Sequence, residues 1–178
     1  MKKIFSLCIA ALLFGACSNN DKLDRETALK LIKDSKSYPK VLSYNIFISD
    51  PSFAKRVLDA GLEESGLVVV QRTRKLGEVG KPIISFTPKA EPYLLPQSDL
   101  DKSEGLQRVK LADEVIQQVT GIQLINDGEK AVVETETTFK NETPFSTLSK
   151  VDYSQRRVQK LKFVLYDDGW RIDERGDL

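Results

Sequence analysis

The chain has 178 residues, with 27 Lys and Arg against 26 Asp and Glu, 40% hydrophobic residues and no histidine. This composition is typical of one globular domain of average size or of two small ones. Because it has no imidazole, the chain is excluded from Ser-His-Asp and Cys-His catalysis, histidine zinc sites and HExxH metalloproteases.

The first residues have the pattern of a secretory signal. Residues 1–3 (MKK) are basic, and residues 4–16 form an uncharged apolar run. The run is shorter than the roughly 20 apolar residues that a membrane-spanning helix needs. We therefore expect residues 1–16 to be a signal peptide and exclude them from the fold.

The apolar run ends in Leu13-Phe14-Gly15-Ala16-Cys17, which resembles the lipobox of bacterial lipoproteins. The resemblance implies that Cys17 becomes the first residue of the mature chain and carries two or three acyl chains, which hold a protein on a membrane stably. Ser18 stands where an Asp would signal retention in the inner membrane. The resemblance therefore implies an outer-membrane anchor, most simply on the periplasmic face.

Removal of residues 1–16 takes away two lysines and changes the formal charge from +1 to −1. A nearly neutral chain exerts no overall electrostatic pull on nucleic acid. Cys8 lies in the discarded segment and Cys17 carries lipid, so no thiol remains for a disulfide, a metal or a nucleophile. We expect no cofactor and no metal.

The mature chain begins with a polar stretch, residues 17–23, that we interpret as a lipidated tether. Asp24 can cap a first helix. Asp50, followed by a proline, can start a second helix that we expect to stop near Gly66. Between the helices, residues 41–48 fit either a short helix or a strand.

Residues 67–71 and 82–86 are β-branched and short, and they predict a hairpin with a charged, glycine-bearing tip. Helix, helix and hairpin over residues 24–95 resemble a winged-helix domain, as do Gly61-Leu62 at the helix exit and the turn at residues 87–90 (TPKA). The resemblance would make the hairpin tip a basic wing. Its cations are Arg72, Arg74, Lys75 and Lys81. Because an exported lipoprotein meets no chromosome, we expect this tip to be a solvated hairpin end or a protein-binding element, with no nucleic-acid partner.

A polar segment, residues 96–105, is predicted as a linker, and residues 106–178 then have the pattern of an antiparallel β-meander. Residues 126–128 (NDG) predict a hairpin turn. Leu161, Phe163 and Leu165 are expected to point inward from the last long strand. The fold class is therefore α+β, with a small helical, winged-helix-like part followed by a meander; whether the two parts are independent stays open.

The run of residues 165–172 (LYDDGWRI) resembles the closing strands of NTF2-like and cystatin-like proteins, within a resemblance that covers residues 106–175. The resemblance implies a curved sheet whose concave face can hold a ligand. Tyr166 and Trp170 are the candidate pocket wall, although a lone tryptophan near a turn is more commonly a core residue.

Two sets of charged residues could carry chemistry. An acidic cluster near the C-terminus could hold calcium or serve as paired carboxylates, but a polar turn and a charged tail explain the same residues without chemistry. Its members are Asp167, Asp168, Asp173, Glu174 and Asp177. The second set is expected to form cross-strand ion pairs on an outer sheet face. Its members are Glu134, Glu136, Lys160 and Lys162.

The sequence thus predicts a lipid-anchored envelope protein that is not an enzyme and that binds a periplasmic protein partner. The alternative is a module that binds a small molecule or lipid on a concave C-terminal sheet. Cys17 is the expected lipidation site, and the candidate binding residues are Tyr166, Trp170, Arg72, Arg74 and Lys75.

Overall fold

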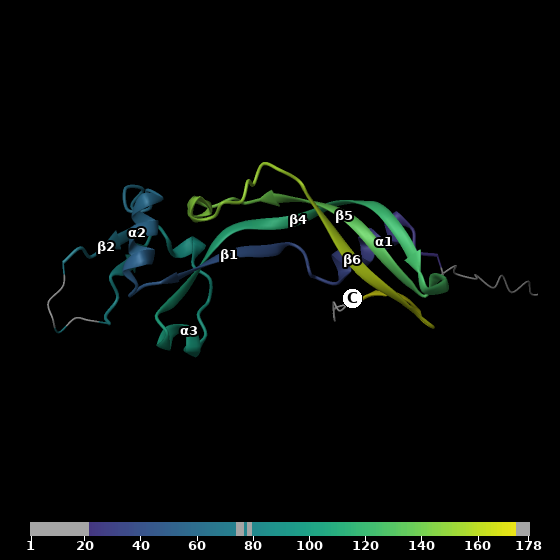
Figure 1. Cartoon of the computed structure of the whole chain (residues 1–178), viewed down its shortest axis with the longest axis horizontal. Coiled ribbons are helices and arrows are strands. Elements are labelled where there is room, and N and C mark those ends of the chain that lie inside the picture. Colours follow the sequence, from purple (N-terminus) through teal and green to yellow (C-terminus); the bar gives the residue numbers. More distant parts are fainter. Residues whose placement is uncertain (1–21, 74–76, 78–79, 174–178) are drawn as a thin grey trace, which may run out of the picture.

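The computed structural model describes residues 22–73, 77 and 80–173. One antiparallel sheet runs along an elongated molecule, with α1 packed at one end and a small lobe built around α2 and β2 at the other (Figure 1). The predicted α+β class is confirmed at this level. The elements are α1 (Arg25–Asp34), β1 (Lys40–Phe47), α2 (Pro51–Asp59), β2 (Val68–Val70), β3 (Ile84–Phe86), η2 (Glu91–Tyr93), α3 (Asp99–Ser103), β4 (Leu106–Ile125), η3 (Asn126–Gly128), β5 (Lys130–Lys140), η4 (Pro144–Leu148), β6 (Arg157–Tyr166) and β7 (Gly169–Ile172).

Both longer helices start where the sequence predicts. The Asp24 carboxylate accepts from the Thr27 N–H at 2.8 Å, and the Asp50 carboxylate accepts from the Ser52 N–H at 2.7 Å, so each satisfies an unpaired donor of its first turn. The end of α2 differs from the prediction. The helix stops before Gly61, whose φ of +69° is the left-handed conformation that ends a helix, and not at Gly66.

The five-stranded sheet has the order β1-β4-β5-β6-β7, and every neighbouring pair is antiparallel. The ambiguous segment 41–48 forms β1, which pairs with the first half of the 20-residue strand β4. The predicted turn at 126–128 joins β4 to β5. Phe163 is fully buried and Leu161 and Leu165 pack beside it, which confirms the inward face of β6. The hairpin predicted from 67–71 and 82–86 is the small sheet β2–β3.

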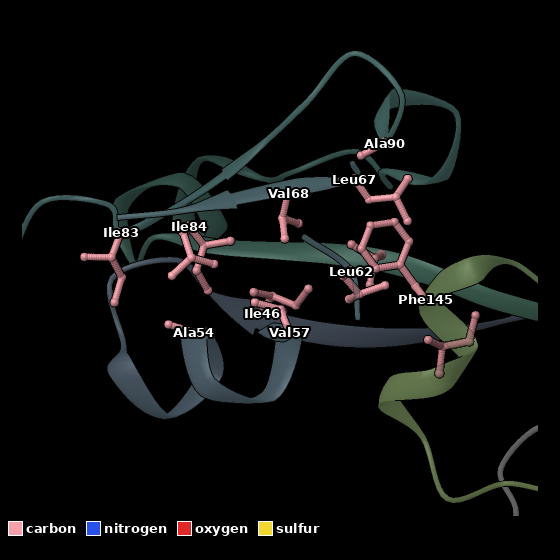
Figure 2. Close-up of a cluster of buried hydrophobic side chains, with 13 residues drawn as sticks. Ile46, Ala54, Val57, Leu62, Leu67, Val68, Ile83, Ile84, Ala90 and Phe145 are labelled. Atoms are coloured by element: carbon pink, nitrogen blue, oxygen red, sulfur yellow. The ribbon is translucent and has the colours of Figure 1, made fainter. Parts of the chain in front are cut away.

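The molecule has two apolar cores. The lobe core contains residues from α2, the β2–β3 hairpin and the adjoining ends of β1 and β4, together with Phe145 from η4 (Figure 2). The sheet core lies where α1 packs on β4 to β7. Its buried members are Leu23, Ala28, Ile32, Val119, Ala131, Val133, Phe163 and Trp170.

These cores divide the chain differently from the predicted segments 24–95 and 106–178. From the first segment, α1 packs on the C-terminal strands and β1 pairs with β4. From the second segment, Phe145 lies in the lobe core. The helix, helix, hairpin order predicted for 24–95 is interrupted by β1, and α1 and α2 contribute to different cores.

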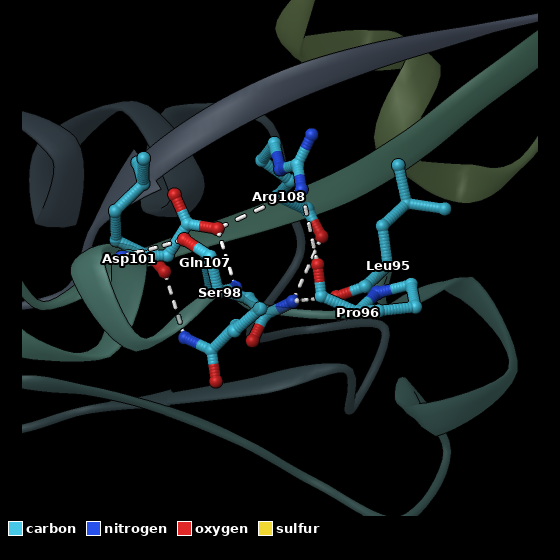
Figure 3. Close-up of polar contacts among 8 residues, drawn as sticks. Leu95, Pro96, Ser98, Asp101, Gln107 and Arg108 are labelled. Atoms are coloured by element: carbon cyan, nitrogen blue, oxygen red, sulfur yellow. Dashed lines mark hydrogen bonds and ion pairs between the residues drawn. The ribbon is translucent and has the colours of Figure 1, made fainter.

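The segment predicted as a linker, 96–105, contains α3 and is held against β4 (Figure 3). Ser98 and Asp101 form a reciprocal capping box at the start of α3, at 3.1 and 2.8 Å. Arg108 on β4 lies 3.6 Å from the Asp101 carboxylate. The Gln107 amide, also on β4, donates to the main chain just before the segment at 2.9 Å.

Candidate functional site

A surface groove of about 440 Å³ lies in the lobe between α2 and the end of β2. Its apolar side chains are Ala54, Leu58, Val70 and Ile83. The polar and remaining lining residues are Pro51, Lys55, Asp59, Gln71 and Arg72. An apolar hollow with charges at its border is the usual form of a recognition site.

The helix α2 presents one side of the groove because of its residue spacing. Ala54 and Leu58 are four positions apart, so they lie one above the other on the same helix face. Val57, which is 1% exposed, is buried in the lobe core and fixes the rotation of the helix. The groove wall is therefore attached to a packed core and is not a loose loop.

Glu63 positions the opposite wall. Its carboxylate accepts from the Val70 N–H at 2.8 Å and forms an ion pair with Arg72 at 2.5 Å. The Val70 N–H, and then the Arg72 guanidinium, hold the pKa of Glu63 below its usual range. The ionised Glu63 thus ties Arg72 and the end of β2 to the segment that follows α2.

The charged border of the groove consists of paired residues. Lys55 and Asp59 form an ion pair at 2.5 Å along α2, and Arg72 pairs with Glu63. Charges of both signs therefore lie beside the apolar floor. Such a border gives little attraction to a strongly charged molecule, and recognition depends on the apolar side chains.

Arg72 is the predicted binding residue that the structure places at this groove. Arg74 and Lys75 lie outside the described residues, as does the lipidation candidate Cys17. Residues 1–16 and most of the tether 17–23 also lie outside them.

Tyr166 and Trp170 lie in the C-terminal hairpin and on opposite faces of it. Trp170 pairs with Leu165, whereas Tyr166 pairs with Gly169, and neighbouring residues of a strand point to opposite faces. Trp170 is 5% exposed and belongs to the sheet core. Tyr166 is 43% exposed, and the centre of its ring lies 5.1 Å from Cζ of the Arg171 guanidinium. The two rings do not form one pocket wall.

The curved face of the C-terminal sheet, which the sequence suggested as a ligand surface, is covered by α1. Ala28 and Ile32 on α1 are both fully buried there. Their apolar contacts are in the sheet core that includes Val133, Phe163 and Trp170.

Two of the charged candidates form ion pairs, each with an arginine and not with a lysine of the predicted cross-strand set. Asp168 pairs with Arg171 beside the last turn. Glu136 pairs with Arg156 at 3.0 Å, and Glu134 lies opposite Lys160 in the β5–β6 register. Glu174 and Asp177 lie outside the described residues, and within the described part no three His, Cys, Asp or Glu side chains are grouped to hold a metal ion.

The apolar positions of α2 can be read from the sequence, but their helical spacing does not tell which of them faces the core and which borders a groove. In the structure Val57 points into the lobe core and Leu58 borders the groove. The signal in the sequence is the width of the apolar stripe on this helix. If the stripe is wider than the surface that packs on the core, some of its apolar side chains stay at the surface.

Within residues 22–73, 77 and 80–173, the structure contains no helix that is both long and apolar enough to cross a membrane. Comparisons with protein families, with curated proteins and with solved structures found no match to this chain.

Proposed function

We propose that this chain is a lipid-anchored lipoprotein of the bacterial cell envelope, without catalytic activity, that binds a periplasmic protein through the groove between α2 and β2. One observation carries the proposal. The groove lies in the lobe, at the opposite end of the molecule from α1, and Cys17 precedes the first residue of α1 by eight positions (Figure 1). Anchor and groove therefore use different ends of one body.

The anchor is proposed at Cys17, on the outer membrane and facing the periplasm. Lys22 lies five positions after Cys17. A chain of that length spans at most about 18 Å, so acyl chains on Cys17 hold the α1 end near the membrane. Leu23, which is 7% exposed, belongs to the sheet core, so this core reaches to within six positions of Cys17.

The partner is proposed to insert apolar side chains into the groove. The floor offers Ala54, Leu58 and Val70, and the flanking ion pairs supply a polar border that excludes water from the contact. Aromatic or long aliphatic anchors of a partner gain most from such a hollow. Within this proposal the β2–β3 hairpin, which takes the place of the wing in the winged-helix resemblance, serves protein binding.

The anchor is tested by intact-protein mass spectrometry and membrane fractionation of the wild type beside Cys17→Ser. We expect the wild type to lose residues 1–16, gain acyl mass and sediment with the outer membrane, and the variant to lose the acyl mass. An unacylated, full-length wild type would refute the anchor.

The groove is tested by photo-cross-linking in cells. A photoreactive residue at Leu58 is expected to yield a discrete adduct, whereas the same residue at Val158, 65% exposed on β6, is the matched control. Ala54→Glu, which places a charge in the groove, should abolish the Leu58 adduct. Equal adducts at Leu58 and Val158 would refute the groove as the partner site.

A second candidate is that the groove binds a small apolar ligand or lipid, because its volume of about 440 Å³ falls within the range of small-molecule pockets. Saturable binding of a fluorescent fatty acid at one equivalent, lost on Ala54→Phe, would favour this candidate. Weak binding that the substitution does not change would exclude it.

A further inference from the structure

Within the part of the chain that the structure describes, β1 pairs only with β4 and so forms a free edge of the five-stranded sheet. The carbonyl of Arg108 on β4 accepts from the Leu95 N–H at 2.9 Å, so it points away from β1. Arg108 lies opposite Asn45 in the register. In an antiparallel pair of strands, two residues that lie opposite each other behave alike. Either the N–H and C=O groups of both point to the neighbouring strand, or those of both point away from it. The N–H and C=O of Asn45 therefore point to the free edge.

The same reasoning applies two residues earlier. The carbonyl of Lys110 accepts from the Thr143 hydroxyl at 2.5 Å, and Lys110 lies opposite Ser43. Ser43 thus also directs its N–H and C=O outward. Ser43 and Asn45 are both exposed, so the main chain on each side of Tyr44 offers hydrogen-bonding groups at the surface.

Most of this edge lacks the features that usually prevent strand pairing. Within β1 the one charged residue is Lys40, at its start, and the register against β4 shifts once, between Leu42 and Ser43. Residues 41–47 (VLSYNIF) contain no charge, proline or glycine, although edge strands are commonly protected by these or by shortness. The other edge strand, β7, has only four residues and carries Arg171. Beyond Phe47 the edge of β1 is closed, because the N–H groups of Ile83 and Ile84 both donate to the Ile48 carbonyl at 2.8 and 3.0 Å.

We propose that β1 pairs with β1 of a second copy of this chain, antiparallel and about a two-fold axis through Tyr44, which joins the two sheets. Ser43 of each copy then lies opposite Asn45 of the other. Because both residues direct their main-chain groups outward, each such pair exchanges two hydrogen bonds. This inference concerns the sheet edge and does not depend on the groove.

The side chains select this register. With the axis at Tyr44, Val41 lies opposite Phe47, so exposed apolar residues meet on one face. On the other face Leu42 lies opposite Ile46, which is already fully buried in the lobe core. Val41 is 45% exposed and Phe47 is 37% exposed, and both become covered. An axis at Ser43 would place Val41 opposite Asn45, and an axis at Asn45 would place Ser43 opposite Phe47. Since cross-strand pairs of apolar side chains stabilise a sheet more than an apolar residue opposite a polar one, the Tyr44 register is preferred.

The arrangement has a consequence for the anchored protein. Since β1 runs from the α1 end toward the lobe, antiparallel pairing places the α1 end of each copy beside the lobe of the other (Figure 1). If both copies carry lipid on Cys17, the dimer lies along the membrane with an anchor near each end.

The test measures the oligomeric state of the full chain by sedimentation equilibrium in detergent. The chain carries Cys8→Ser and Cys17→Ser. We expect a dimer. The variants Ser43→Lys/Asn45→Lys and Ser43→Glu/Asn45→Glu each place like charges opposite one another twice, which should raise the dissociation constant by about tenfold or more. A mixture of the two variants should restore dimers, because opposite charges then meet. Val69→Lys, a charge on an exposed valine of β2 that is 56% exposed, is the matched control and should leave the dimer unchanged.

Disulfide formation between the two copies tests the register of the β1–β1 pair, again in the chain that carries Cys8→Ser and Cys17→Ser. Mixed Ser43→Cys and Asn45→Cys chains should cross-link several-fold more than either chain alone, and this readout stands even if a charged variant fails to fold. A protein that stays monomeric at about 100 μM, well above the concentration at which micromolar affinity gives dimers, overturns the proposal. Failure of the charge-swapped mixture to dimerise, or cross-linking of Ser43→Cys to a different envelope protein in cells, also overturns it.

Discussion

The ring of Phe145 meets the ring of Tyr93 edge-on, with 6.1 Å between ring centroids. Phe145 comes from η4, between β5 and β6, whereas Tyr93 comes from η2, before β4. Phe145 also lies 6.3 Å from Phe86 and is fully buried. A residue of the C-terminal half therefore completes the core of the lobe, and the two halves of the chain share one folded body.

Phe145→Ala is expected to lower the free energy of unfolding by about 3 to 5 kcal/mol, the usual cost of removing a buried phenylalanine ring. Because the lobe core and the sheet share β1 and β4, we expect one unfolding transition, followed by circular dichroism and by Trp170 fluorescence in urea. Two separate transitions in the wild type, with only one moved by the substitution, would show independent halves.

Trp170 and Tyr166 provide a paired test of the C-terminal hairpin. Trp170→Ala removes a core ring that is 5% exposed and should cost about 3 to 5 kcal/mol. Tyr166→Ala removes a 43% exposed ring and its contact with Arg171, and should cost about 1 kcal/mol or less. Thermal unfolding of both variants checks this. A larger loss for Tyr166→Ala would mean that its ring has a structural role that its exposure does not indicate.

The sequence was informative where structure depends on neighbouring residues. Asp24 and Asp50 mark helix starts because an N-cap acts within three residues, and the turn at 126–128 is encoded by its own three residues. The inward face of β6, with Leu161, Phe163 and Leu165, was also predicted, because a strand buried on one face alternates in this way.

Contacts between distant residues could not be predicted. Nothing local in residues 41–48 specifies pairing with a strand 59 to 72 positions later, and the same residues fitted a helix. The groove could not be predicted for the same reason, since its walls come from α2 and from residues 70–72, which are separated in the sequence. Only the fold brings these surfaces together, so a stripe of apolar residues on α2 was visible while its partner wall was not.

Glu114 is a buried carboxylate in the sheet, 2% exposed, that accepts from Thr137 Oγ1 at 2.7 Å and from Gln159 Nε2 at 3.0 Å. Glu114→Leu removes the acceptor of the Gln159 amide and leaves the Thr137 hydroxyl only the more distant Arg157 carbonyl, at 3.4 Å, so it should cost about 3 kcal/mol. Glu114→Gln keeps an acceptor oxygen and should cost about 1 kcal/mol. Urea unfolding measures the difference. Equal losses would mean that the hydrogen bonds contribute little.

Tyr38 reports on the charge of Glu114. Burial, and then the negative charge of Glu114, raise the pKa of the Tyr38 hydroxyl above its usual value. Glu114→Gln removes the charge but not the burial, so the pKa of Tyr38 should fall part of the way toward its usual value. Ring resonances of Tyr38, followed by NMR against pH, give this pKa, and Glu134→Gln on the outer face of β5 is the control. An unchanged Tyr38 titration in Glu114→Gln would contradict the coupling.

Asp113 is expected to contribute to acid sensitivity. Burial raises the pKa of Asp113. Hydrogen bonds from Lys110 at 2.6 Å and Asn141 at 2.8 Å, together with the Lys110 charge, lower it by more than burial raises it. The pKa of Asp113 therefore lies below the ordinary value of 3.8. Since the folded pKa lies below the unfolded one, the stabilisation is complete above the unfolded value and is lost as the pH falls through the folded pKa.

Asp113→Asn should therefore destabilise the protein at pH 7 and flatten the decline in unfolding free energy below about pH 4, near the unfolded pKa of an aspartate. Lys110→Met should remove much of this difference, because the ammonium is one of the two groups that hold the carboxylate ionised. Urea unfolding from pH 7 to pH 2 of the wild type, the two single variants and the double variant measures the coupling. Parallel pH curves for the wild type and Asp113→Asn would show that this carboxylate does not titrate with folding.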